Sequence, residues 1–168
     1  RRINSALALM KRHNVPVPDV LISSLGTRIH YGQNLTEDNY WADHIDHYWS
    51  RQRIQRIIAG LPGLEMQPKS EQTAFKLSYY YNPEISPTVE EIVSQLQQKD
   101  ITANVMLSYG HCIDIVPSRA SKGQALRYVV QRLGIPLEPS LAVGGSGVDE
   151  DIARGIALGV GGGKQTHE

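Results

Sequence analysis

The chain has 168 residues, and its 17 lysines and arginines balance 17 aspartates and glutamates, so the formal net charge is zero. Nucleic-acid-binding proteins usually carry a basic excess or stripe, so this composition argues against DNA or RNA as the main partner. The single cysteine, Cys112, excludes an internal disulfide. Every apolar run is much shorter than the roughly 18 residues of a membrane span. We therefore expect a soluble, cytoplasmic protein with no membrane partner.

The N-terminal segment predicts a helix followed by a buried strand. Apolar residues recur with helical spacing over Ile3–Met10. After two prolines, Val20–Ile22 is an apolar run without alternation, which favours a buried parallel strand. The alternating segment Thr27–Tyr31 is expected to form one arm of a hairpin. Because the chain starts with Arg1 at the edge of the first helix, we expect it to be a piece of a longer protein.

The middle of the chain predicts a separate layer of helices and strands. Thr88 and Glu91 have the spacing of a capping box, which predicts that a helix begins at this point. Helical or alternating apolar spacing defines the expected elements. These are helices at 51–61 and 88–99 and strands at 75–81, 101–108 and 112–116.

The C-terminal part returns to an α/β pattern. Ser121 is expected to cap a helix over Lys122–Leu133. A strand at Leu141–Val143, a helix at Asp149–Ile156 and a strand at Ala157–Val160 are expected to follow. The outer parts predict an α/β core made of residues 1–32 and 118–168, and residues 33–117 predict an inserted α+β domain.

Lys122 is the most informative candidate for ligand binding. A lysine in the first turn opposes the helix dipole, at a cost of about 0.3 to 1 kcal/mol. An anion bound there reverses the sign, because free N–H groups at a helix N-terminus bind phosphate. The alternatives are that Lys122 is solvated or pairs with Asp149 or Glu150.

Two glycine-rich segments match nucleotide motifs poorly. The segment 143–149 lies between an expected strand and an expected helix, where ligands of open α/β sheets bind. Glu150 nevertheless occupies the place of the third glycine of the dinucleotide fingerprint. The run 159–164 has too few residues between its glycines for a phosphate loop, and Gln165 follows its lysine. A tight turn from strand to helix is the alternative for the first segment.

Other candidate residues are weaker. His44 and His47 have a spacing that allows a shared helix face and metal binding, but no further ligands are marked. The favoured alternative is an aromatic surface that stacks on a sugar or packs between the core and the inserted domain. The tyrosines at 79–81 are interpreted as strand packing. No nucleophile elbow surrounds Ser23 and Ser24.

Three segments carry a resemblance to a known family. They are residues 19–32 (DVLISSLGTRIHYG), 75–79 (FKLSY) and 113–126 (IDIVPSRASKGQAL). Together they resemble the sucrose-phosphate phosphatase domain of the haloacid-dehalogenase superfamily. The variant fused behind the glycosyltransferase part of sucrose-phosphate synthases looks closest. The resemblance implies a Rossmann-like core with an inserted α+β cap, and the core's first strand would precede Arg1.

The resemblance also implies a phosphatase site, of which this chain keeps a part. Lys122 corresponds to the phosphate-binding lysine and Asp149 to the last acid of the magnesium-binding segment. Gly145 stands where the first magnesium-binding aspartate is expected, and Val148 replaces the asparagine. Magnesium takes oxygen ligands, which neither residue's side chain supplies. The nucleophile strand and the phosphate-binding threonine would also precede Arg1. The magnesium site is therefore expected to be degraded.

These observations lead to a hypothesis with two competitors. The chain is predicted to be a catalytically degenerate phosphatase-like domain of a sucrose-phosphate synthase that binds sucrose 6-phosphate, with a glycosyltransferase domain as its partner. Lys122 is assigned to the phosphate, and Lys76, His111 and Asp114 are candidates for the sugar. The first competitor is an active magnesium-dependent phosphatase that uses Asp149. The second is a structural module that stabilises the glycosyltransferase.

Overall fold

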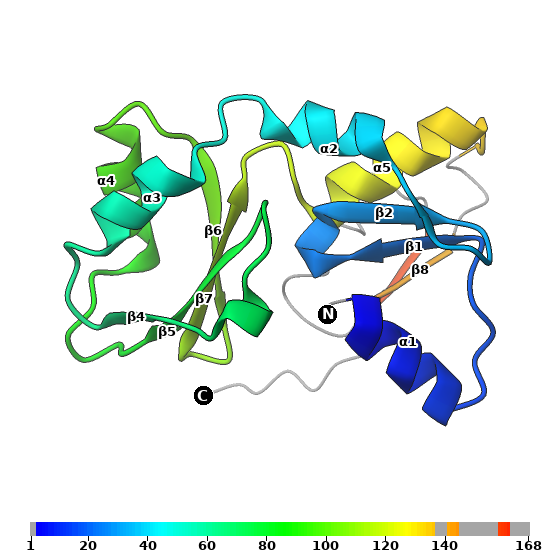
Figure 1. Cartoon of the computed structure of the whole chain (residues 1–168), viewed down its shortest axis with the longest axis horizontal. Coiled ribbons are helices and arrows are strands. Elements are labelled where there is room, and N and C mark those ends of the chain that lie inside the picture. The colour runs from blue at the N-terminus through cyan, green and yellow to red at the C-terminus, as the bar shows by residue number, and fades with distance from the viewer. Residues whose placement is uncertain (1–2, 137–140, 145–157, 162–168) are drawn as a thin grey trace. The chain divides into compact units, whose positions relative to one another are not determined.

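The computed structural model describes residues 3–136, 141–144 and 158–161 (Figure 1). The chain divides into two compact units. Unit 1 comprises residues 1–38 and 121–168, and unit 2 comprises residues 39–120. Unit 2 is therefore an insertion between the two halves of unit 1. In the part of the chain that the structure describes, no helix is both long and apolar enough to cross a membrane.

The first half of unit 1 consists of a helix and a small antiparallel sheet. Helix α1 (Ile3–Arg12) precedes strands β1 (Val20–Ser23), β2 (Arg28–Tyr31) and β3 (Thr36–Glu37). The short turn η1 (Ser24–Gly26) joins β1 to β2, and the strand order is β1-β2-β3. The hairpin arm expected at 27–31 is present as β2.

The direction of the first strand differs from the expectation. The run at Val20–Ile22 was predicted to lie in a parallel sheet, but among the described residues β1 pairs only with β2, antiparallel, with Val20 opposite Tyr31. Turn η1 reverses the chain immediately after β1, so a hairpin forms. An apolar run shows that a strand is buried, but it carries no information about the direction of the neighbouring strand.

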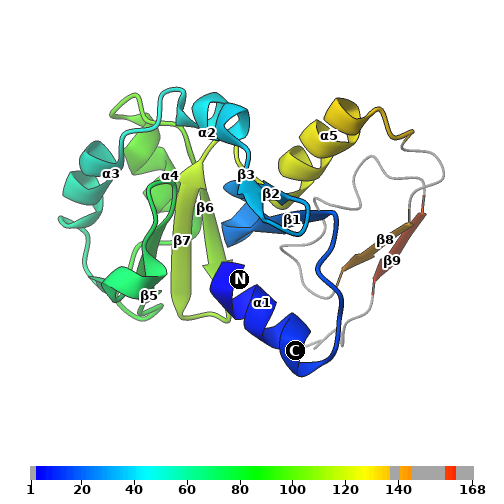
Figure 2. The ribbon, with the colours of Figure 1, turned by 45° about the vertical axis from the view of Figure 1, so that its right-hand side comes forward.

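The second half of unit 1 begins with helix α5 (Lys122–Leu133), which has the bounds that the sequence predicts. Ser121 caps it, because its hydroxyl accepts a hydrogen bond from the backbone of Gln124. Strands β8 (Leu141–Gly144) and β9 (Leu158–Gly161) follow as a parallel pair (Figure 2). They match the strands expected there to within one residue. The helix expected at 149–156 lies outside the described residues.

Unit 2 is a four-stranded antiparallel sheet with three helices. Its helices are α2 (Asn39–Asp46), α3 (Arg51–Ile58) and α4 (Val89–Gln97). The strands, in the order β4-β5-β7-β6, are β4 (Leu64–Met66), β5 (Leu77–Tyr81), β7 (Cys112–Pro117) and β6 (Ala103–Ser108). A short turn, η2 (Lys69–Glu71), lies between β4 and β5. Strand β4 was not expected from the sequence, because three residues are too few to show a period.

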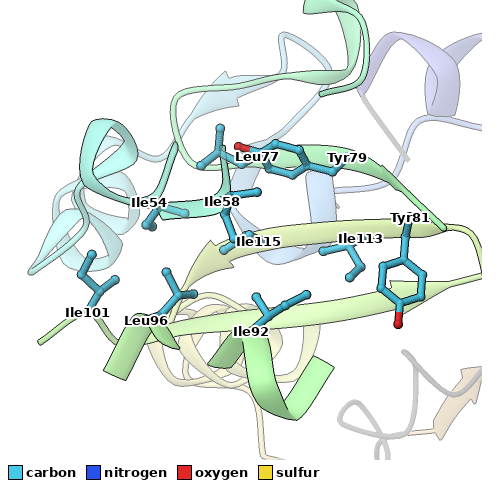
Figure 3. Packing of buried hydrophobic residues seen from close by; sticks show 10 residues of the cluster. All are labelled: Ile54, Ile58, Leu77, Tyr79, Tyr81, Ile92, Leu96, Ile101, Ile113 and Ile115. Atoms are coloured by element: carbon cyan, nitrogen blue, oxygen red, sulfur yellow. The ribbon is translucent and has the colours of Figure 1, made fainter. Parts of the chain in front are cut away.

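The core of unit 2 forms between the sheet and helices α3 and α4. Isoleucines and a leucine from the helices pack against apolar and tyrosine side chains of β5 and β7 (Figure 3). The members of this cluster are Ile54, Ile58, Leu77, Tyr79, Tyr81, Ile92, Leu96, Ile101, Ile113 and Ile115. Burial of the alternate residues of β5 and β7 leaves the intervening residues on the opposite face of the sheet.

The unit boundaries lie slightly beyond the expected ones. The first change of unit falls after Asp38 rather than after Gly32, because β3 pairs with β2 and the Asp38 N–H donates to Ile29. The second falls after Ala120 rather than after Pro117. Here the side-chain amide of Asn104 in β6 donates to the carbonyl oxygens of residues 117, 118 and 120, at 3.4, 3.3 and 2.9 Å. These contacts keep residues 118–120 in unit 2.

Candidate functional site

The sheet register of unit 2 brings a lysine, a serine and an aspartate together. Ser78 in β5 lies directly opposite Asp114 in β7. Both residues are out of phase with the core residues of their strands, so they lie on the sheet face that α3 and α4 do not cover. Lys76 precedes Ser78 by two residues and shares this face. Two of the three sugar candidates, Lys76 and Asp114, therefore lie side by side.

These three side chains form a closely bonded cluster. The Lys76 ammonium donates to the Ser78 hydroxyl at 2.6 Å and lies 3.2 Å from Asp114 Oδ1. The Ser78 hydroxyl lies 2.5 Å from the same Asp114 oxygen. The Lys76 side chain is 9% exposed and that of Asp114 is 18% exposed. The attraction between the two charges and the hydrogen bonds through Ser78 oppose the cost of removing the charges from water.

The cluster keeps part of its bonding capacity for a ligand. An ammonium group has three donors, and the described contacts of Lys76 involve two acceptors. Within the described part of the chain, the hydrogen bonds of the Asp114 side chain all use Oδ1, which leaves Oδ2 as an acceptor. A rigid group of one donor and one acceptor suits a hydroxyl, which donates and accepts at once.

The segment before Lys76 is fixed by polar contacts. The Gln72 side-chain amide donates to the Ser78 carbonyl oxygen at 2.8 Å and accepts from the Ser78 N–H at 2.9 Å. Arg51 of α3 donates to the carbonyl oxygens of Thr73 and Lys76 at 2.5 and 2.9 Å. The indole N–H of Trp49 donates to the Ala74 carbonyl at 2.9 Å. The segment that precedes Lys76 is therefore fixed both by strand β5 and by Trp49 and Arg51.

Sequence reasoning missed Ser78, Gln72 and Arg51 as parts of this site. The signal available for Ser78 was its place among the alternating residues of β5, where it is a small polar residue on the face away from the core. Gln72 and Arg51 act through backbone groups, those of Gln72 six residues away and those of Arg51 22 and 25 residues away. No periodic spacing along the chain marks such contacts.

The structure does not bring His111 into the cluster. His111 lies in the exposed turn between β6 and β7, and its Nδ1 atom lies 2.6 Å from the Tyr109 carbonyl oxygen. Its ring also faces that of Tyr109, at 6.3 Å between centroids. No described contact joins His111 to Lys76, Ser78 or Asp114. A role of His111 in sugar binding stays a prediction.

Lys122 is the first residue of α5 in unit 1. The start of α5 is defined by the Ser121 cap, with 3.1 Å between the serine hydroxyl and the Gln124 nitrogen. Lys122 is partly buried and takes part in interactions of its own. The residues assigned to the magnesium site, Gly145, Val148 and Asp149, lie outside the described residues.

A buried carboxylate, that of Asp38, lies in unit 1. The Asp38 side chain is 1% exposed and accepts hydrogen bonds from the hydroxyls of Tyr31, at 2.9 Å, and Tyr128, at 3.3 Å. The Arg132 guanidinium lies 3.8 Å away. Burial, together with the hydrogen bond to Asp38, raises the pKa of Tyr31 well above its ordinary value. These contacts join β2, the end of β3 and α5 within unit 1.

The metal alternative for His44 and His47 receives no support. In the described parts of the chain, no group of three or more histidine, cysteine, aspartate or glutamate side chains is placed to hold a metal ion. The His44 ring stacks on Trp41 at 5.5 Å between centroids, and the His47 ring lies 3.9 Å from that of Tyr48. His44 thus packs on the buried Trp41 within α2, and His47 packs on Tyr48 just after the end of that helix.

Comparison with known proteins identifies relatives over nearly the whole chain. A family model described as Sucrose-6F-phosphate phosphohydrolase matches residues 1–168. Probable sucrose-phosphatase 3b of Arabidopsis thaliana is 31% identical over 149 residues, which are 86% of this chain and 35% of that protein. Mannosylfructose-phosphate phosphatase of Agrobacterium fabrum is 27% identical and is matched over 95% of this chain and 66% of its own length. The chain thus spans about a third of the plant relatives.

Solved structures give the same result for the fold. The sucrose-phosphatase of Synechocystis, in complex with sucrose and phosphate, superposes with a TM-score of 0.84 at 30% identity, covering 95% of this chain and 65% of that one. A haloacid dehalogenase-like hydrolase of Bacillus subtilis superposes with a TM-score of 0.61 at 17% identity, covering 95% of this chain and 63% of that one, which shows the shared fold alone. The expected α/β fold with a Rossmann-like core is confirmed.

The comparisons modify one part of the sequence hypothesis. The resemblance was placed closest to the domain fused to sucrose-phosphate synthases, whereas the relatives reported above are phosphatases by name. They favour the phosphatase alternative over the synthase-linked one. Because the family model matches the chain from its first residue to its last, this chain belongs to the Sucrose-6F-phosphate phosphohydrolase family.

Proposed function

We propose that this chain binds sucrose 6-phosphate, or a disaccharide phosphate of the same class, as part of a phosphatase. The complete protein then cleaves the phosphate ester with water to release the free sugar and inorganic phosphate. The Lys76–Ser78–Asp114 cluster carries the proposal, because it is a rigid, partly desolvated set of donors and acceptors on the sheet face of unit 2 that α3 and α4 do not cover. The relatives named as phosphatases of sucrose phosphate and mannosylfructose phosphate support this substrate class.

The two units contribute different contacts in this proposal. Asp114 Oδ2 accepts a hydrogen bond from a sugar hydroxyl, and the remaining N–H of Lys76 donates to a sugar oxygen. Lys122 and the first N–H groups of α5 bind the phosphate, whose negative charge reverses the unfavourable interaction between the lysine and the helix dipole. Hydrogen bonds to such a charged group contribute about 1.5 to 3 kcal/mol each.

Hydrolysis requires groups beyond those that the structure describes. When bound, magnesium neutralises charge on the phosphoryl oxygens, and we propose that Asp149 is one of its ligands in the complete protein. The presence of Gly145 and Val148 in the sequence favours a second candidate function, in which the domain binds the sugar phosphate without hydrolysing it. Fusion to a glycosyltransferase is a further prediction of that second candidate.

Phosphate release distinguishes the two candidates. We expect the complete protein to release inorganic phosphate from sucrose 6-phosphate in the presence of magnesium, and Asp149→Ala to abolish this release. A matched exposed variant, Lys11→Ala, serves as the control for the loss of a charge in unit 1. If the complete protein binds sucrose 6-phosphate but releases no phosphate above background, the binding-only function is the correct one. If it does not bind the ligand, both candidates are wrong.

A further inference from the structure

The turn between β1 and β2 packs directly against the first turn of α5. A Cβ atom added to Gly26 would lie 2.2 Å from the Ser121 carbonyl oxygen, 2.3 Å from its carbonyl carbon and 2.7 Å from the Lys122 nitrogen. Real Cβ atoms essentially never come this close to backbone atoms. Only glycine therefore allows the backbone of this turn to contact the start of α5.

The turn is also held in an uncommon backbone conformation. Three successive residues have positive φ, namely Ser24 at 51°, Leu25 at 62° and Gly26 at 88°. Such conformations persist where the surroundings determine them strongly, and they concentrate at ligand sites and switch regions. Thr27 is 2% exposed, and its hydroxyl donates to the Ser24 carbonyl at 2.9 Å, which closes the turn on itself.

From this contact we infer that Gly26 is a positioning residue for phosphate binding, a role that rests on the proposed function of Lys122. The 24–27 turn fixes the Ser121–Lys122 backbone, and that backbone determines where the first N–H groups of α5 and the Lys122 side chain point. Binding groups must be held to within about 0.5 Å of their productive geometry. A displacement of the helix start therefore weakens phosphate binding even though Gly26 itself does not contact the ligand.

The test compares two glycines that have the same backbone requirement and different surroundings. Gly32 has a φ of +66°, but a Cβ atom added there meets nothing within 4 Å. Gly32→Ala therefore introduces the unfavourable φ without displacing α5, whereas Gly26→Ala introduces both. We expect Gly26→Ala in the full chain to weaken binding of sucrose 6-phosphate and of inorganic phosphate by tenfold or more in calorimetric or NMR titrations. Binding of plain sucrose should change less than twofold, and Gly32→Ala should change none of the three by more than twofold.

A milder pair of variants covers the case in which Gly26→Ala does not fold. Thr27→Val removes the hydroxyl that closes the turn while it preserves the shape of the side chain, and Thr27→Ser keeps the hydroxyl. Phosphate binding should weaken severalfold in Thr27→Val and recover in Thr27→Ser, with sucrose binding unchanged in both. Equal effects of Thr27→Val on sucrose and on phosphate would overturn the inference, because they would indicate a general loss of structure.

A double-mutant comparison separates this inference from the proposed function. If Gly26 acts through the start of α5, the effects of Gly26→Ala and Lys122→Ala on phosphate affinity overlap in the double variant and do not add. Full additivity would overturn the positioning role. If Lys122→Ala leaves phosphate affinity unchanged, the proposed phosphate site itself is wrong. If only Gly26→Ala and Thr27→Val lack an effect, the proposed site stands and the positioning role fails.

Discussion

The two regions that carry candidate ligand contacts are built in different ways. In unit 2, strand register brings together three side chains that contact one another at 2.5 to 3.2 Å. In unit 1, the start of α5 is located by backbone packing against Gly26 and by the Ser121 cap. Substitutions in the first region should therefore act through unpaired charge. Those in the second region should act through small displacements of the backbone.

The largest expected effect is the loss of stability when the charge of Lys76 is removed. Lys76→Met leaves the Asp114 carboxylate with the Ser78 hydroxyl but without its charged partner, and such a change costs about 3 to 5 kcal/mol of the free energy of unfolding. The double variant Lys76→Met/Asp114→Leu should recover most of this loss, because it removes both charges. Urea denaturation followed by circular dichroism measures both values. The exposed Lys69→Met is the matched control in unit 2 and should change stability by less than about 0.5 kcal/mol. A double variant less stable than Lys76→Met would contradict this account.

A medium effect is expected at the buried carboxylate of unit 1. Asp38→Ala leaves the Tyr31 and Tyr128 hydroxyls without this acceptor and should cost about 1 to 3 kcal/mol. Arg132→Ala should cost much less, because the Arg132 side chain is 45% exposed and its contact with Asp38 is long, at 3.8 Å. The comparison is made by thermal unfolding of the three proteins. If Arg132→Ala were as destabilising as Asp38→Ala, the charge pair would be the dominant contact, contrary to the role given to the tyrosines.

The smallest effect is expected at the surface pair of β2 and β3. The hydrogen bond from Arg28, at 2.7 Å, and the Arg28 charge hold the pKa of Glu37 below its ordinary value. The contribution of the Arg28–Glu37 pair to stability is therefore complete at pH values above the ordinary pKa of a glutamate. It is lost as the pH falls through the lowered pKa of Glu37. Both side chains are more than a third exposed, so Glu37→Gln should cost no more than about 1 kcal/mol at neutral pH. The difference from the wild type should vanish in acid. A difference that grew as the pH fell would contradict the sign of this shift.

The sequence predicted elements whose ends carry local signals. The Thr88–Glu91 capping box starts α4 and the Ser121 cap starts α5, as expected, because these interactions depend on residues three apart. The pairing direction of β1 differs from the prediction and β4 was not predicted, since both depend on pairing with another strand rather than on signals within the strand itself. The Lys76–Asp114 contact depends likewise on the β5–β7 register.

The candidate site was predictable to the same limited extent. The family resemblance named Lys76 and Asp114, and the structure brings them together, whereas it leaves His111 in an exposed turn. Nothing in the spacing of the sequence marks Gln72 or Arg51, because their partners are backbone carbonyls fixed by the fold. The role inferred for Gly26 likewise needed coordinates, since the close approach to Ser121 joins segments about 95 residues apart.

The central claim is that unit 2 recognises the sugar and the start of α5 recognises the phosphate. The most direct test is to titrate the full chain with sucrose and with sucrose 6-phosphate, in the wild type, Asp114→Asn and Lys122→Ala. We predict that Asp114→Asn weakens both ligands by a similar factor. Lys122→Ala should weaken only sucrose 6-phosphate, by about tenfold to a hundredfold, because about 1.4 kcal/mol corresponds to one decade of affinity. Equal weakening of both ligands by Lys122→Ala, or weakening of neither by Asp114→Asn, would contradict the claim.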